Sequence, residues 1–255
     1  MWSMLKQFDA YTLRARIFPA LIAGLPTLAL LFVMVPWDRL GISHVIAATM
    51  SLVLLFAFAD VARRTGRIVE AKLGTRATPE LWYHDNQEID AITKDRYRAF
   101  MAAKLKKSAP TAEDEVRDIK HANHFYLSAG HWLRDNTRDT KKFKILFDEL
   151  LTYGFRRNLL GLKPVALILN AVVLALTSAA LYSHWEYSAI QQTQEKLILI
   201  VAVVVLHSAY MIFAVDKEAV RDASKSYGKQ LIFCCETLMK GGSDAPAKTK
   251  AKSTQ

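Results

Sequence analysis

The chain has 255 residues, a formal net charge of +10 and a hydrophobic fraction of 52%. It contains no Walker loop, no dinucleotide-binding glycine pattern and no Gly-x-Ser-x-Gly motif, so the common signatures of nucleotide-hydrolysing, dinucleotide-dependent and esterase-type enzymes are excluded. We therefore expect a protein that is not an enzyme, with no catalytic residue, no cofactor and no metal ion.

Four long runs of the chain contain no Asp, Glu, Lys or Arg. They are Ile17–Val35, Ile42–Ala59, Val165–Tyr182 and Leu197–Val215, of 19, 18, 18 and 19 residues. At about 1.5 Å per helical residue, each is close to the ~20 residues that cross a hydrocarbon core of about 30 Å. The sequence predicts an all-α integral membrane protein with four transmembrane helices in two hairpins and a helical cytoplasmic module between them.

The distribution of Lys and Arg predicts the orientation of these helices. The loops Pro36–Gly41 and Ser183–Lys196 hold one each, and the other 32 of the 34 lie elsewhere. Because Lys and Arg accumulate on the cytoplasmic side of a membrane, we expect a multi-pass protein of the inner (plasma) membrane with both termini in the cytoplasm.

The expected segments follow one another as an amphipathic N-terminal arm, a first hairpin, a basic helical module, a second hairpin, a cytoplasmic helix and a disordered tail. Their ranges are 1–16, 17–59, 60–164, 165–215, 216–239 and 240–255. In the first hairpin, Pro26 removes a backbone hydrogen bond and predicts a kink. The second span is expected to continue as one helix to Leu73 and to end at Gly74.

Helix-start signals divide the module. Asp85 followed by Glu88 resembles a capping pair that opens a helix through about Lys107, and Thr111 with Asp114 predicts another helix start. The latter helix carries an apolar stripe at helical spacing. The stripe comprises Ala122, Phe125, Tyr126, Ala129, Trp132 and Leu133.

The last helix of the module is expected over Lys141–Leu160. It leads to Pro164, a residue type suited to the first turn of the third span. The three histidines of the preceding helix, His121, His124 and His131, are spaced too widely to bind one metal ion together. The adjacent Cys234 and Cys235 are expected to be reduced and buried on a helix.

The module carries more positive than negative residues, 21 Lys and Arg against 15 Asp and Glu between Asp60 and Lys163. This excess indicates an anionic partner, which is a lipid headgroup, a nucleotide or a nucleic acid. The candidate ligand-binding residues are Arg138, Lys141, Lys142, Lys144, Arg156 and Arg157. Pairing with anionic membrane lipid is favoured for the last two, whereas for the other four both ligand classes stay open.

Polar residues in the last two spans are the candidates for lining a pore. They are Asn170, Thr177, Ser178 and His207. Such residues line a water-filled path or join helices by hydrogen bonds, and the second role is favoured here. His207 fits a gate or a neutral packing histidine, again with the second favoured. The absence of any charge within the spans argues against a proton-coupled transporter.

Two runs carry a resemblance. They are Trp132–Phe143, with the sequence WLRDNTRDTKKF, and Tyr153–Pro164, with the sequence YGFRRNLLGLKP. The region Lys72–Pro164 resembles a family of bacterial four-span membrane proteins of unassigned function. That family is similar in layout to membrane effectors of anti-phage systems, such as the Hailong effector and the four-span effectors of cyclic-oligonucleotide systems. The resemblance implies a partner nucleotidyltransferase whose product controls a membrane channel.

We therefore expect a membrane effector of a bacterial anti-phage system. It would be a homo-oligomeric ion channel or membrane-disrupting protein, controlled by a nucleotide or short oligonucleotide bound to the basic module. A membrane scaffold that recruits a cytosolic partner without conducting, and a small-solute transporter, are the alternatives.

Overall fold

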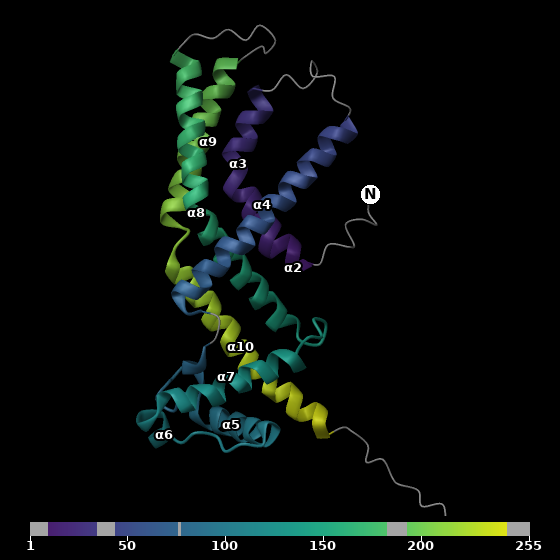
Figure 1. The fold of residues 1–255 in the computed structure, drawn as a ribbon, viewed down its shortest axis with the longest axis vertical. Coiled ribbons are helices and arrows are strands. Elements are labelled where there is room, and N and C mark those ends of the chain that lie inside the picture. Colours follow the sequence, from purple (N-terminus) through teal and green to yellow (C-terminus); the bar gives the residue numbers. More distant parts are fainter. Residues whose placement is uncertain (1–9, 35–43, 76–77, 183–192, 244–255) are drawn as a thin grey trace, which may run out of the picture. The chain divides into compact units, whose positions relative to one another are not determined.

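The residues that the structure describes form helices and no strand, which confirms the all-α prediction (Figure 1). The computed structural model describes residues 10–34, 44–75, 78–182 and 193–243, without the side chains of 10, 44–48, 50–52, 193 and 241–243. Most of the N-terminal arm, the loops within both predicted hairpins and most of the tail lie outside this range.

The helices are of three kinds. In chain order they are α2 (Ala10–Thr12), the π-helix η1 (Leu13–Ile17), α3 (Phe18–Met34), α4 (His44–Leu73), the 3-10 helix η3 (Pro79–Trp82), α5 (Ala91–Leu105), α6 (Ala112–Arg117), α7 (Ile119–Asn136), α8 (Lys144–Tyr182), α9 (Thr193–Phe213) and α10 (Lys217–Ser243).

The chain forms two compact units. The first unit comprises residues 1–76 and 150–223, and the second comprises 77–149 and 224–255. This division crosses the predicted module, 60–164, whose ends fall in the first unit. The module as a cytoplasmic domain therefore stays a prediction.

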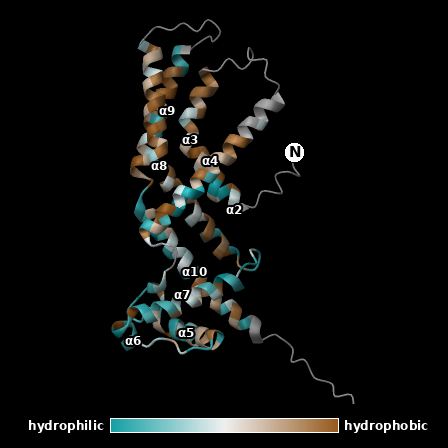
Figure 2. Cartoon of the chain, in the orientation of Figure 1, coloured by the Kyte–Doolittle hydropathy of each residue, from teal (hydrophilic) through white to brown (hydrophobic). Residues whose placement is uncertain are grey.

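Among the residues that the structure describes, three helices are long and apolar enough to cross a membrane: Leu13–Met34, Lys144–Tyr182 and Gln194–Phe213. Figure 2 shows the apolar character of α3, α8 and α9 along most of their length. These helices contain three of the four predicted spans. The remaining run, Ile42–Ala59, begins among residues and side chains that the structure does not describe, so its span and the four-span layout stay predictions.

Helix α4 runs without a break from His44 to Leu73, as the sequence predicts. Gly74 follows with a φ of +67°, a conformation that costs glycine little and other residues much. The amide of Thr75 then donates to the carbonyl of Glu70 at 3.2 Å, the bond that closes a Schellman motif. The predicted helix stop is confirmed.

Helices α4 and α8 cross at glycine. A Cβ at Gly161 would lie 2.6 Å from backbone atoms of Thr65 and Gly66, so the two backbones touch. Beside the crossing, the fully buried Asn158 donates from Nδ2 to the carbonyl of Ala15 at 2.6 Å. Small residues thus allow α4, α8 and η1 to pack together within the first unit.

The expectation that α8 begins a new helix at Pro164 is wrong. Helix α8 continues through Gly161 and Pro164 without interruption. The close packing of Gly161 on α4 holds this turn in place, and Pro164 removes one amide without ending the helix. Lys163 donates to the carbonyls of Ile212 (3.0 Å) and Val215 (2.8 Å), where a cation complements the C-terminal end of α9.

Local capping corrects two further expectations. Helix α5 begins at Ala91, and its cap is Asp90, whose carboxylate accepts from the amide of Thr93 at 2.8 Å; the proposed Asp85–Glu88 pair does not open it. The Thr111–Asp114 capping box is confirmed. Its helix is broken at Asp118, however, because this carboxylate accepts from the amide of His121 at 3.0 Å and starts α7.

The core of the second unit confirms the apolar stripe of α7. All of its members are buried except the half-buried Trp132. Against it pack α5, η3, the start of α8 and the second half of α10, which contributes Cys234 and Cys235. Both cysteines are free and buried, as expected, and burial raises the pKa of Cys234 to about 11 and that of Cys235 to about 12.

Candidate functional site

Polar side chains of α8 and α9 meet inside the first unit. Asn170 Nδ2 lies 3.0 Å from His207 Nδ1 and donates to Ser208 Oγ at 2.8 Å. The other ring nitrogen of His207, Nε2, lies 2.8 Å from the carbonyl oxygen of Ile22 on α3. Since a carbonyl only accepts, Nε2 carries the proton and Nδ1 accepts from Asn170. These contacts join three helices.

The partner of His207 follows from the sequence of α3. In an α-helix the carbonyl of residue 22 accepts from the amide of residue 26, but that residue is Pro26, which has no amide hydrogen. The carbonyl of Ile22 is therefore left without its helical partner. His207 supplies the missing donor, which explains why a polar ring lies at this point of an apolar helix pair.

The other two candidate pore residues lie elsewhere on α8. Thr177 is fully buried and donates to the carbonyl of Val173 in its own helix at 2.7 Å. Ser178 is exposed on the single chain. Asn170 and His207 thus make the hydrogen bonds of the helix-joining alternative, whereas the hydrogen bond of Thr177 stays within α8. A pore lined by any of the four residues stays a prediction.

The predicted ligand-binding residues divide between the two units. In the second unit, Arg138 pairs with Asp135 at 2.6 Å. The amides of Lys141 and Lys142 donate to Asp139 at 2.9 and 3.1 Å, leaving both side chains exposed. Lys144, also exposed, begins α8. These four cations lie on an open turn and helix start.

Arg156 and Arg157 belong to the first unit and point into different surroundings. Arg156 donates to the carbonyl of Ala219 at 3.0 Å. Arg157 forms an ion pair with Glu70 of α4, in which both side chains are largely buried, at 11% and 15% exposure. Only Arg157 reaches a cavity rich in other cations.

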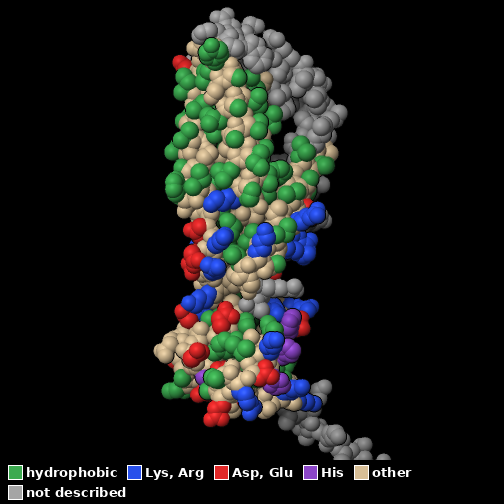
Figure 3. All heavy atoms as spheres, turned by 60° about the vertical axis from the view of Figure 1, so that its left-hand side comes forward, with side chains coloured by type: hydrophobic (Ala, Val, Ile, Leu, Met, Phe, Trp, Pro, Cys, Tyr) green, Lys and Arg blue, Asp and Glu red, His purple; other side chains and the backbone are tan. Residues whose placement is uncertain are grey.

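That cavity, here called the arginine pocket, has a volume of about 380 Å³, within the ~300–1,000 Å³ typical of small-ligand sites. It is lined by Tyr11, Arg16, Arg63, Arg67, Glu70, Ala71 and Arg157. The lining residues come from α2, η1, α4 and α8, all of the first unit. On the face that Figure 3 shows, Lys and Arg side chains gather at one end of the apolar helices.

One wall of the pocket is rigid. The carboxylate of Glu70 accepts from Arg157, and its Oε2 lies 3.2 Å from the hydroxyl of Tyr153. That hydroxyl is also 3.1 Å from the carbonyl of Thr75 and 3.0 Å from the Thr75 hydroxyl. The guanidinium of Arg157 lies over the Tyr153 ring, 5.4 Å from its centroid. This network holds Arg157 in one orientation.

The remaining cations of the pocket have no acidic partner among the residues that the structure describes. Arg16 lies over the ring of Tyr11, at 5.4 Å. Arg63 and Arg67 pair with no acidic residue in the part of the chain that the structure describes. The four arginines and one glutamate of the lining therefore leave three positive charges in excess. Chemically, such a site binds an anion through guanidinium forks.

Sequence reasoning found one arginine of this pocket, Arg157, and missed its partners. Arg63 and Arg67 are four residues apart on a helix that continues from the uncharged run Ile42–Ala59. This spacing places both on one face and was the available signal. Arg16 comes from a segment 47 residues before Arg63 in the chain, so only packing of η1 beside α4 brings it to the site.

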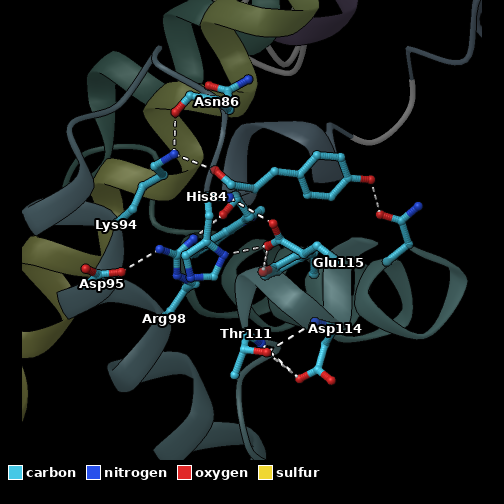
Figure 4. A network of polar contacts seen from close by, with 12 residues as sticks. His84, Asn86, Lys94, Asp95, Arg98, Thr111, Asp114 and Glu115 are labelled. Atoms are coloured by element: carbon cyan, nitrogen blue, oxygen red, sulfur yellow. Dashed lines mark hydrogen bonds and ion pairs between the residues drawn. The ribbon is translucent and has the colours of Figure 1, made fainter. Parts of the chain in front are cut away.

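The second unit holds a separate polar network, shown in Figure 4. Lys94, 1% exposed, donates to the carbonyls of Tyr83 and Asn86, and burial followed by the charge of Arg98 lowers its pKa. Arg98 donates to the carbonyl of Trp82 and to Asp95.

Around this pair of cations, Glu115 accepts from the backbone amide of His84 at 2.9 Å, and His84 Nδ1 lies 3.0 Å from the same carboxylate. The hydroxyl of Tyr126 donates to Glu115 as well, and burial raises the pKa of that hydroxyl. Each polar group thus satisfies a buried carbonyl or carboxylate, so the network stabilises the segment between η3 and α5.

Comparison with protein-family models, curated proteins and solved structures gave no match to this chain. For the described part of the chain, the fold and the site define the class only as all-helical, with three helices long and apolar enough to cross a membrane and an arginine-lined pocket.

Proposed function

We propose that the chain is a multi-span membrane effector whose membrane helices respond to an anionic ligand bound in the arginine pocket. The effector is a homo-oligomer of the bacterial inner membrane, and its response is the opening of a channel or the disruption of the bilayer. The anti-phage setting, with a nucleotide or oligonucleotide made by a partner nucleotidyltransferase, remains part of this proposal through the resemblance in sequence.

The observation that carries the proposal is the continuity of the helices. Arg63 and Arg67 lie on α4, and Arg157 lies on α8, and each helix runs without a break from the pocket into an apolar run. A ligand that draws these arginines together therefore changes the crossing of α4 and α8 at Gly161, and helices transmit such a change along their length.

A flux measurement tests this function. The full chain is reconstituted in vesicles that enclose an ion-sensitive fluorescent dye, and both ion flux and dye release are recorded with and without added nucleotides and cyclic oligonucleotides. The proposal predicts ion flux or dye release that depends on ligand and on Arg63 and Arg67. Insertion into the vesicles without any ligand-dependent flux or release refutes the effector function.

A membrane scaffold is the second candidate, and the hydrogen bonds of Asn170 and His207 favour it. These two side chains are used in joining helices, as a protein that does not conduct would require. The scaffold predicts no flux under any condition, together with recovery of a cytosolic protein on the reconstituted chain that is lost when the exposed cations Lys141 and Lys142 are changed to Glu.

A further inference from the structure

The arginine pocket lies at the same end of all the apolar runs that contribute to it. Arg16 directly precedes the run that starts at Ile17, and Arg63 and Arg67 follow Ala59 by four and eight residues. Arg157 precedes Val165 by eight residues. At about 1.5 Å per residue these side chains begin within about 12 Å of the ends of the runs.

This depth coincides with the polar layer of a bilayer. The hydrocarbon core is about 30 Å thick and the whole bilayer about 40–45 Å, so each headgroup layer is about 5–8 Å deep. The pocket therefore opens at or just beneath the level of lipid phosphates, a placement that rests on the proposed function, since it requires the runs to span the membrane. A soluble ligand from the cytoplasm reaches the same level.

The charge of the pocket selects among anions. Its lining carries four arginines and one glutamate, and Glu70 already neutralises Arg157. A phosphodiester carries one negative charge, whereas a phosphomonoester carries about −1.5 to −2 at pH 7 and has three acceptor oxygens. Three excess positive charges, one on η1 and two on α4, match the second group better, because each guanidinium then reaches an oxygen of its own.

We propose that the arginine pocket binds a phosphomonoester group, held by Arg16, Arg63 and Arg67, while Arg157 and Glu70 form the fixed wall against which it lies. The phosphate belongs to the headgroup of a membrane lipid or to a soluble nucleotide. These two sources share the chemistry of recognition, and the following experiment separates them.

The full chain is placed in nanodiscs of phosphatidylcholine, alone or with phosphatidic acid, whose headgroup is a phosphomonoester, or with phosphatidylglycerol, an anionic phosphodiester. Lipid retained by the protein is measured by native mass spectrometry. In a second arm, the affinity for AMP is compared with that for cyclic AMP, again a monoester and a diester, in neutral nanodiscs. Preferential retention of phosphatidic acid assigns a lipid ligand, and preferential binding of AMP assigns a soluble one.

Matched variants locate the binding. R63Q/R67Q removes two forks of the pocket, and R14Q/R64Q removes the same charge from exposed arginines of η1 and α4 that are not among its lining residues. Because two charge-assisted hydrogen-bond donors are lost, the first variant is expected to lose about tenfold or more in affinity for the monoester. The second is expected to change by less than about twofold, because Arg14 and Arg64 do not line the arginine pocket.

A conservative variant guards against misfolding. R63K/R67K keeps both charges and removes the planar forks, so its loss of affinity is expected to lie between those of the other two variants. The phosphate site is overturned if the chain binds monoester and diester equally in both arms. It is also overturned if the pocket variant and the control variant lose the same affinity for the monoester. These binding assays do not depend on flux. If the chain binds the monoester here but shows no ligand-dependent flux in the vesicle assay, only the proposed function is refuted.

Discussion

The glycine crossing of α4 and α8 gives a sharp prediction for Gly161→Ala. The added methyl group would lie 2.6 Å from backbone atoms of Thr65 and Gly66, where ordinary contacts are 3.4–4 Å. The two helices must therefore separate by about 1 Å, and such overpacking costs about 1–3 kcal/mol. Alanine recovers up to about 1 kcal/mol of helix propensity. With about 1 kcal/mol recovered against about 1–3 kcal/mol lost, the net expectation is a loss of up to about 2 kcal/mol in the free energy of unfolding.

Gly24→Ala is the matched control, because Gly24 lies on α3 of the same unit and a Cβ there meets nothing within 4 Å. Only the propensity gain applies, so this variant should be unchanged or more stable. Thermal unfolding of both variants in detergent, followed by circular dichroism, should show Gly161→Ala melting up to about 8 °C below the unchanged chain, at about 2–4 °C per kcal/mol. A melting temperature for Gly161→Ala at or above that of Gly24→Ala would refute the close crossing.

Three further predictions concern hydrogen bonds, charge and burial. His207→Phe should destabilise the chain by about 1–3 kcal/mol, because the carbonyl of Ile22 loses its donor. The loss should be smaller in a chain that also carries Pro26→Ala, which restores an amide donor to that carbonyl. A double-mutant cycle of melting temperatures measures the difference. Hydrogen bonds from Lys225 and Lys229 lower the pKa of Glu88 in the folded chain. The stability that this carboxylate contributes should therefore be fully present above its unfolded pKa of about 4.3 and be lost as the pH falls. In Glu88→Gln, the melting temperature should depend less on pH in this range. Cys234 and Cys235 should resist maleimide at pH 7.5 and react once the chain is unfolded in denaturant.

Each of these has an outcome that would contradict it. Additive effects of His207→Phe and Pro26→Ala would mean that the ring does not serve the carbonyl of Ile22. An unaltered pH profile for Glu88→Gln would mean that its carboxylate gains nothing from the lysines of α10. Labelling of the folded chain at the rate of a free thiol would mean that Cys235 is accessible.

The sequence alone predicted the elements whose causes are local. Long uncharged runs indicate helices that can cross a membrane, and three of them lie in helices of sufficient length. Thr111 with Asp114 and the glycine at position 74 mark helix ends because a cap and a left-handed turn depend on a few neighbouring residues. The stripe of α7 was equally readable, since burial follows a 3.6-residue period.

Only the tertiary structure showed the features that depend on contact between segments far apart in the sequence. Pro164 continues α8, although its residue type favours a helix start, because Gly161 packs on α4. Pro26 predicts that the carbonyl of Ile22 lacks a helical donor. Only the packing of α9 on α3 shows that His207 supplies this donor. The arginine pocket combines Arg16, Arg63 and Arg157 from three distant segments, and no local pattern states which cations share a cavity. Local sequence sets backbone preferences, whereas a binding site is a property of the packing between helices.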